Sequence, residues 1–153
     1  MPAPPPFRAP TLPLQASTPL PLTGSDRPRV AAAVFGAGLD LTESVRSGAG
    51  AAPPVIRERF DALERYSPEL DRDLDDLTFY DLGDLELDGL PMTAALDAID
   101  AALTHAARVA AVGVVLGGEH TASLGACRGI KRVHPDALLL QLDAHAPTGS
   151  DAS

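Results

Sequence analysis

One segment near the end of the 153-residue chain constrains the fold more than any other. An apolar run over residues 112–116 ends in two glycines, an amphipathic stretch follows, and a second apolar run covers residues 137–142. This alternation predicts a strand, a helix and a parallel strand, and open α/β sheets bind ligands at the carboxyl ends of their strands. His120 follows the first run, and Asp143 and His145 follow the second.

These three side chains are candidate metal ligands. Asp143 and His145 are two residues apart, so both side chains point to the same side of an extended chain. A carboxylate and an imidazole on one side form a mixed oxygen and nitrogen ligand set, which borderline divalent ions accept. We therefore expect His120, Asp143 and His145 to meet at one edge of the sheet and to bind a metal ion. A tight glycine turn, with His120 at the start of a helix, explains the first motif equally well without a metal.

The residues around these ligands resemble a known family. The letters GGEHT, followed by LDAHA, are similar to motifs of the ureohydrolases, the arginase and agmatinase family of dinuclear manganese enzymes. The resemblance implies that His120, Asp143 and His145 bind Mn²⁺, with two ions in the intact family site; zinc would accept the same three residues. The family's second motif continues with another aspartate, where this chain has Pro147. The resemblance therefore implies a partial metal site.

The first half of the chain resembles the agmatinase branch in particular. The matching positions are Ser44, Arg46, Gly48, Ile56 and Arg57, and the stretch YSPELDRD is also similar. The resemblance implies hydrolysis of a small guanidino substrate, agmatine, to putrescine and urea by a metal-activated hydroxide. Arginine or another guanidino substrate remains an alternative. A non-catalytic, metal-binding remnant is the other, because the motifs cover about the first half of a family enzyme and the chain ends at Ser153. No catalytic residue is assigned apart from the three metal ligands.

Alternating elements precede the metal-ligand segment. Residues 29–35 and 77–84 predict parallel strands, and residues 53–64 predict a helix whose first turn accommodates two prolines. Residues 91–111 predict the longest helix, with apolar residues at three- and four-residue steps. This order predicts an α/β fold with three α-β-α layers around a parallel sheet. The resemblance implies that it is arginase-like and incomplete on its C-terminal side.

Several polar residues receive a structural interpretation. The first predicted helix has one apolar face, formed by Val55, Ile56, Phe60 and Leu63. Arg57 is expected on the opposite, solvent-facing side. Asp81 and Asp84 lie at the end of the predicted strand 77–84, where aspartate commonly ends strands and caps turns. His105 and His134 have no other metal-ligand residue at useful spacing, so both are expected to be structural.

Composition separates a tail from a domain and narrows the partners. Residues 1–28 hold nine of the fifteen prolines without helical or strand periodicity, which predicts a disordered tail before an α/β domain at residues 29–153. The net charge of −9 argues against nucleic acid and anionic membranes as partners, and no apolar run is long enough to span a membrane. The single Cys127 excludes an internal disulfide and fits a reducing compartment, so we expect a cytoplasmic protein. The family resemblance implies a homo-oligomer.

Overall fold

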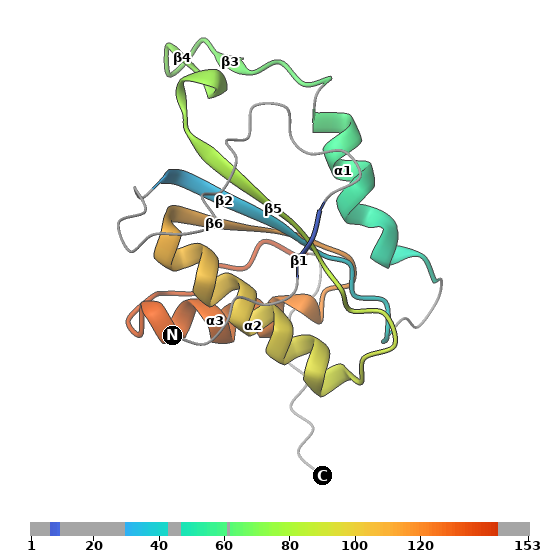
Figure 1. Ribbon diagram of the computed structural model, residues 1–153. Helices are drawn as coiled ribbons and strands as arrows, with labels where there is room; N and C mark the ends of the chain where they lie inside the picture. The colour runs from blue at the N-terminus through green and yellow to red at the C-terminus, as the bar shows by residue number, and fades with distance from the viewer. Residues whose placement is uncertain (1–6, 10–29, 43–46, 61, 144–153) are drawn as a thin grey trace.

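The computed structural model describes residues 7–9, 30–42, 47–60 and 62–143. They form a sheet with helices on both faces (Figure 1). Its strands are β1 (Phe7–Arg8), β2 (Val30–Ala37), β5 (Phe79–Leu85) and β6 (Ala110–Gly117), in the order β1-β5-β2-β6. The last three are parallel, and β1 pairs with β5 in the antiparallel direction. The layers and the parallel sheet confirm the predicted α/β class.

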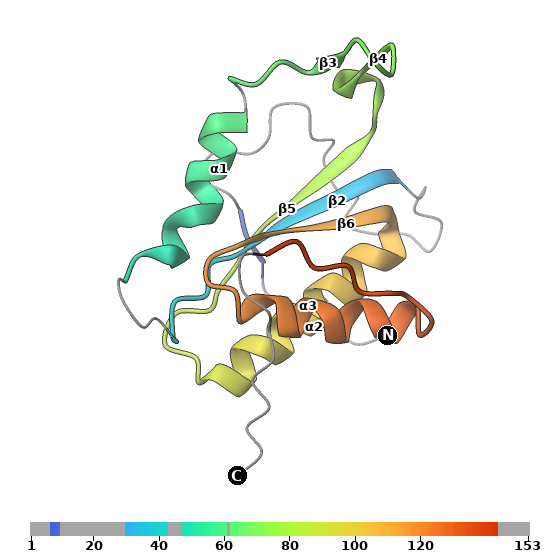
Figure 2. The same cartoon turned by 180° about the vertical axis from the view of Figure 1, so that it is seen from behind.

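The helices lie in two layers. On one face of the sheet, α2 (Met92–Val109) and α3 (Ala122–Val133) pack against each other, and α1 (Ala52–Phe60) lies on the other face (Figures 1 and 2). The buried side chains of α2 follow the predicted three- and four-residue steps, and include Ala95, Leu96, Ile99, Ala102, Leu103 and Ala106. On α3, a Cβ atom at Gly129 would collide with a backbone oxygen of α2. The glycine therefore allows the two helices to approach closely.

The core lies mainly between the sheet and the α2–α3 layer. Strand β2 is largely buried along its length, as expected for a central parallel strand covered on both faces. Phe35 from β2, Tyr80 from β5 and Ile99 from α2 are fully buried in or beside this core. Burial of apolar side chains from three different elements is what holds the sheet to its helices.

Helix α1 turns a different face to the sheet than its apolar pattern predicts. Arg57 is 2% exposed and Pro53 is also buried, whereas Val55 and Leu63 are more than half exposed. The expectation that Arg57 faces solvent is wrong. Two carboxylates of β5, those of Asp81 and Asp84, lie within hydrogen-bonding distance of the guanidinium, and they compensate for its burial.

The apolar run after α3 is not part of the sheet. Residues 137–143 return toward the end of β6 without forming a strand (Figure 2), and β6 pairs only with β2 among the described strands. The predicted strand at residues 137–142 is wrong as a sheet element. A strand with apolar side chains on both faces needs a paired neighbour and cover on each side, and no described element supplies them here.

Short elements complete the described chain. Between α1 and β5, the strands β3 (Tyr66–Ser67) and β4 (Arg72–Asp73) form a small hairpin, and two 3₁₀ turns occupy Ala49–Ala51 (η1) and Leu74–Asp76 (η2). Within the predicted tail, residues 7–9 are described, and the Phe7 ring lies 6.5 Å from that of His105 between centroids. His105 is therefore a packing residue, as expected. Among the described helices, none has the length and apolar character needed to cross a bilayer.

Candidate functional site

The structure brings two of the three predicted metal ligands together. His120 follows β6 in the turn before α3, and Asp143 arrives from the segment that follows α3. Nδ1 of His120 lies 2.8 Å from Oδ2 of Asp143, and Nε2 lies 3.5 Å from the side-chain nitrogen of Gln141. The His120 side chain is 60% exposed and that of Asp143 is 17% exposed. The pair therefore lies at the carboxyl edge of the sheet and is open to solvent on the histidine side.

The spacing of these two atoms fits a shared cation. Two ligand atoms at right angles, each about 2.1 Å from one ion, lie about 3.0 Å apart. The observed 2.8 Å between the imidazole nitrogen and the carboxylate oxygen is close to that value. An oxygen and nitrogen pair also suits the borderline divalent ions. The same 2.8 Å is also the length of an ordinary hydrogen bond or ion pair between the two side chains, so the geometry is compatible with a shared metal ion without requiring one.

The described residues supply only this part of a metal site. His145, the third predicted ligand, and Pro147 lie outside the described residues. Across the ranges that the structure describes, no group of three or more histidine, cysteine, aspartate or glutamate side chains could hold a metal ion. Among the described residues the candidate site thus consists of His120 and Asp143 alone. A metal ion would need further ligands from outside these residues.

Glu119, next to the candidate ligand, fastens the loop that follows β2. Its Oε2 accepts hydrogen bonds from the backbone N–H groups of Leu41 (2.8 Å) and Thr42 (2.7 Å). The Thr42 hydroxyl donates to Oε1 at 2.8 Å. Burial acts to raise the pKa of Glu119, but these hydrogen bonds and that of Thr121 outweigh it and lower the pKa below its usual value. The carboxylate therefore anchors the loop in its charged form.

Backbone contacts bring the same loop against the end of β6. The N–H of Gly118 donates to the carbonyl oxygen of Ala37 at 3.1 Å, and that of Glu119 donates to Leu39 at 3.0 Å. A Cβ atom at Gly118 would collide with the carbonyl oxygens of Leu39 and Ala49. Because glycine allows this close approach, both ends of the loop reach the candidate metal edge. Further along, Asp40 accepts a hydrogen bond from the N–H of Gly48.

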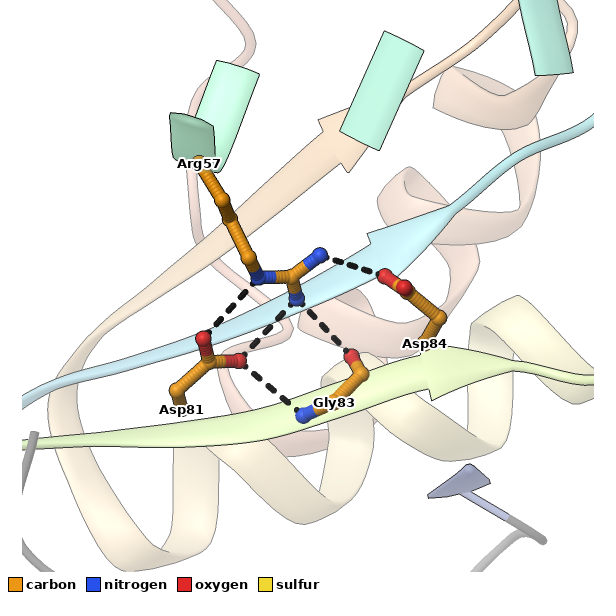
Figure 3. A network of polar contacts seen from close by, with 4 residues as sticks. All are labelled: Arg57, Asp81, Gly83 and Asp84. Carbon is orange, nitrogen blue, oxygen red and sulfur yellow. Dashed lines mark hydrogen bonds and ion pairs between the residues drawn. The ribbon is translucent and has the colours of Figure 1, made fainter. Parts of the chain in front are cut away.

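A buried ionic network fixes α1 beside the ends of β2 and β5 (Figure 3). Arg57 donates from Nε and Nη2 to the two carboxylate oxygens of Asp81, at 2.9 and 3.0 Å, and from Nη1 to Asp84 at 2.6 Å. Nη2 also donates to the carbonyl oxygen of Gly83. Burial acts to lower the pKa of Arg57, but the two carboxylates outweigh it and raise the pKa. Asp81 and Asp84 hold the Arg57 guanidinium in this network, which agrees with the structural role expected for them.

The sequence interpretation missed the roles of Glu119 and Arg57. Glu119 lies beside His120 and directly after two glycines. A carboxylate at such a turn can accept hydrogen bonds from backbone N–H groups, as it does here from Thr42, and this was the sequence signal for its role. For Arg57, the signal was an arginine four residues after a helix-opening proline, on the same helix face as Pro53. Neither signal identifies the residue that is bound, because the partners of Glu119 lie 77–78 residues away in sequence and those of Arg57 lie 24–27 residues away.

Comparison with known proteins places the chain in a family. A model of the arginase family matches residues 30–153. An agmatinase of Bacillus subtilis is 36% identical over 114 residues, which are 74% of this chain and 39% of the relative. A proclavaminate amidinohydrolase of Streptomyces clavuligerus is 29% identical over 118 residues, 75% of this chain and 37% of that protein. The chain spans about two fifths of the length of these curated relatives.

Solved structures give the same result. A putative agmatinase from Clostridium difficile superposes with a TM-score of 0.63 at 36% identity, covering 70% of this chain and 39% of that chain. An agmatine ureohydrolase of Thermoplasma volcanium superposes with the same TM-score at 27% identity, covering 77% of this chain and 38% of its own. With most of its length matched by the family model and its fold matched by these structures, the chain belongs to the arginase family.

Proposed function

We propose that the chain carries part of a ureohydrolase active site, which hydrolyses a guanidino compound with the help of bound metal. The observation that carries the proposal is the pairing of His120 with Asp143 at the carboxyl edge of the sheet. That pair supplies one nitrogen and one oxygen ligand in a chain that is 36% identical to an agmatinase. The family's reaction breaks a carbon–nitrogen bond of the guanidino group, adds water across it, and yields an amine and urea.

The side chains at this edge have separate roles in the proposal. His120 and Asp143 would hold the metal ion, together with His145. When bound, a divalent ion of this kind makes water acidic enough to act as a nucleophile near neutral pH. Glu119 keeps the loop after β2 beside these ligands through Leu41 and Thr42, so that the loop borders the place where a substrate would lie. Arg57 ties α1 to β5 beside this edge.

Agmatine is the substrate that we propose and manganese is the metal. Four curated relatives are agmatinases, at 31–36% identity. Other relatives act, by their names, on guanidinobutyrate, formimidoylglutamate and N1-aminopropylagmatine, at 30–31% identity. The substrate therefore has to be decided by assay and not by similarity. The oxygen and nitrogen pair suits manganese and zinc alike, so the metal also needs measurement.

Metal binding and urea release test the proposal together. The purified chain is loaded with Mn²⁺ or Zn²⁺, bound ions are counted by elemental analysis, and urea is measured with agmatine and with arginine. We expect the unmodified chain to bind Mn²⁺ and the variants His120→Asn and Asp143→Asn to lose it. The control His134→Asn should keep the metal, because His134 lies at the far end of α3. Metal that binds equally well to His120→Asn would contradict the assigned ligands.

A second candidate is a metal-binding protein without turnover. It is favoured by one observation: the described residues bring only two ligands together, whereas two ions need more. The combined measurement of bound metal and released urea distinguishes the two candidates. Urea formation that requires His120 supports the enzyme, and one weakly bound ion without urea supports the binding protein.

A further inference from the structure

A β-bulge in β5 turns two carboxylates toward helix α1. Val34 and Gly36 of β2 pair with Asp81 and Asp84 of β5, so a two-residue step on β2 faces a three-residue step on β5. Residues three apart in a regular strand point to opposite faces of a sheet. The extra residue, with Gly83 at a φ of 88°, instead places both carboxylates on the side of α1 (Figure 3). The bulge thus builds a binding site for one guanidinium group.

Arg57 fills this site and ties α1 to the sheet. Its guanidinium lies 2.9 Å from Asp81 and 2.6 Å from Asp84. Pro53, four residues earlier on the same helix face, is also buried. A Cβ atom at Gly36 of β2 would collide with both Pro53 and the carboxylate of Asp84. Helix α1, β2 and β5 are therefore in close contact at one point, and α1 has little room to shift while Arg57 stays bound.

The first turn of α1 carries this restraint to the candidate metal edge. The helix begins at Ala52, directly after the 3₁₀ turn η1, and the N–H of Ala52 donates a hydrogen bond to the carbonyl oxygen of Ala49. That carbonyl lies against the end of β6, because a Cβ atom at Gly118 would collide with it. Gly118 comes two residues before His120 in the chain. A displacement of α1 would therefore move the backbone that packs beside the residues leading to His120.

Further contacts join η1 to the segment that follows β2. A Cβ atom at Gly38 would collide with the carbonyl oxygen of Gly50. The carboxylate of Asp40 accepts a hydrogen bond from the N–H of Gly48 at 2.9 Å. The η1 turn is therefore packed as one unit with the loop segment that Glu119 anchors at the end of β6.

We propose that Arg57 is a positioning residue for the candidate metal edge. Held by the two carboxylates of β5, it fixes α1 and η1 against Gly118, and this contact sets the place of His120 beside Asp143. Arg57 acts through the backbone and does not touch the metal. The inference rests on the proposed function where it concerns metal binding, whereas the link from α1 to the end of β6 rests on the fold alone.

Hydrogen exchange, read residue by residue with NMR, tests that link in the metal-free, full 153-residue chain. Arg57→Lys keeps the charge but lacks the planar fork that reaches both carboxylates. We expect the amides of Gly118 and Glu119 to exchange about tenfold faster, because the carbonyl groups that they bind lie at and just after the end of β2, beside η1. Amides in the centre of α2, on the other face of the sheet, should change no more than in the control variant.

The control variant is Val30→Ala. It removes methyl groups from a buried side chain at the opposite, amino end of β2 and leaves the ion network intact. Urea unfolding of each variant shows how much of a change in exchange comes from global stability. Asp84→Asn loosens the network from the β5 side at nearly unchanged volume, and should speed exchange at the same two amides. It carries the test if Arg57→Lys does not fold.

Titration with Mn²⁺ tests the link from Gly118 to the metal ligands. Residues that touch neither of two linked sites can alter their coupling by a factor of about two to thirty. Arg57→Lys should weaken Mn²⁺ binding by a factor of this size, at a temperature at which the variant is fully folded. Val30→Ala should bind as tightly as the unmodified chain, and His120→Asn identifies the binding that belongs to the candidate site.

Two results would overturn the proposal. The first is exchange that, after correction for global stability, changes at Gly118 and Glu119 no more in the two ion-network variants than in Val30→Ala. The second is faster exchange at these amides with unchanged Mn²⁺ affinity, because the link would then end before His120. A chain without His120-dependent Mn²⁺ binding would contradict the proposed function instead, and exchange at the two amides would still decide whether Arg57 positions the end of β6.

Discussion

Removing the guanidinium of Arg57 should destabilise the protein more than any other charge removal in the described chain. The side chains of Arg57 and Asp81 are each 1% exposed, and that of Asp84 is 16% exposed. In Arg57→Met the two carboxylates would lose three hydrogen bonds and the charge of the guanidinium while remaining largely buried. Removing one partner of a buried ion pair costs roughly 3–5 kcal/mol. Since a domain of this kind is stable by about 5–15 kcal/mol, the loss should be a large fraction of the total.

Urea unfolding followed by circular dichroism measures this loss. The control is Arg65→Met, which breaks the exposed ion pair with Asp75, whose side chains are 35% and 53% exposed. An exposed pair is worth about 0–1 kcal/mol, so the two variants should differ by roughly 2–5 kcal/mol. Arg57→Lys should fall between them, because lysine keeps the charge and lacks the planar fork that reaches both aspartates.

The reasoning also predicts which second change restores stability. If unpaired buried carboxylates cause the loss, Arg57→Met combined with Asp81→Asn and Asp84→Asn should recover part of it, since neutral amides are less costly to bury. An Arg57→Met variant that unfolds at the same urea concentration as Arg65→Met would refute the argument. A triple variant no more stable than Arg57→Met alone would show that lost packing of the arginine, and not the unpaired carboxylates, causes the effect.

Three further changes test local features. Glu119→Gln should speed hydrogen exchange at the Thr42 amide by about tenfold, because an amide oxygen accepts weaker hydrogen bonds than a carboxylate; unchanged exchange would contradict the loop anchor. Gly118→Ala should destabilise by about 1–3 kcal/mol in urea, because its Cβ would collide with loop carbonyls, and a neutral effect would show that the loop moves aside. The hydrogen bond to Asp71 raises the pKa of Tyr66 in the folded protein. The contact therefore stabilises the protein fully at pH values below the tyrosine pKa of the unfolded chain, and this stabilisation is lost as the pH rises through the pKa of Tyr66 in the folded protein. Asparagine adopts the positive φ of Asp71 as readily as aspartate does, so Asp71→Asn should keep the backbone unchanged. The variant should shift the ultraviolet titration of Tyr66 to lower pH. A titration identical to that of the unmodified chain would argue against the contact.

Much of the fold followed from local patterns. The strands β2, β5 and β6 and the helix α2 were predicted near their observed bounds, because apolar periodicity reports which face of an element is buried. Of the three predicted metal ligands, His120 and Asp143 were expected to lie together and do so. The meeting did not depend on the predicted parallel strand, because Asp143 reaches His120 from a segment that pairs with no strand of the described sheet.

The pattern failed where an element's environment comes from distant residues. The apolar residues of α1 predicted the wrong buried face, because periodicity cannot register that Asp81 and Asp84 would surround Arg57. The run at residues 137–142 has the composition of a buried strand, but a strand exists only where another strand satisfies its backbone groups. Amino-acid composition indicates whether a segment favours the strand conformation, but it does not show whether another strand lies beside it to pair with.

By itself, the sequence determined the alternating α/β order and the buried stripe of α2, because each depends on side-chain chemistry within a short stretch. It also predicted the candidate metal ligands, which stay a prediction. The tertiary structure alone decided that Arg57 is buried, that Glu119 anchors the loop after β2, and that the leucines of residues 138–142 remain exposed. These outcomes depend on which groups from distant parts of the chain come within a few ångströms. Hydrogen bonding, ion pairing and burial act over that short range, so only the assembled fold decides them.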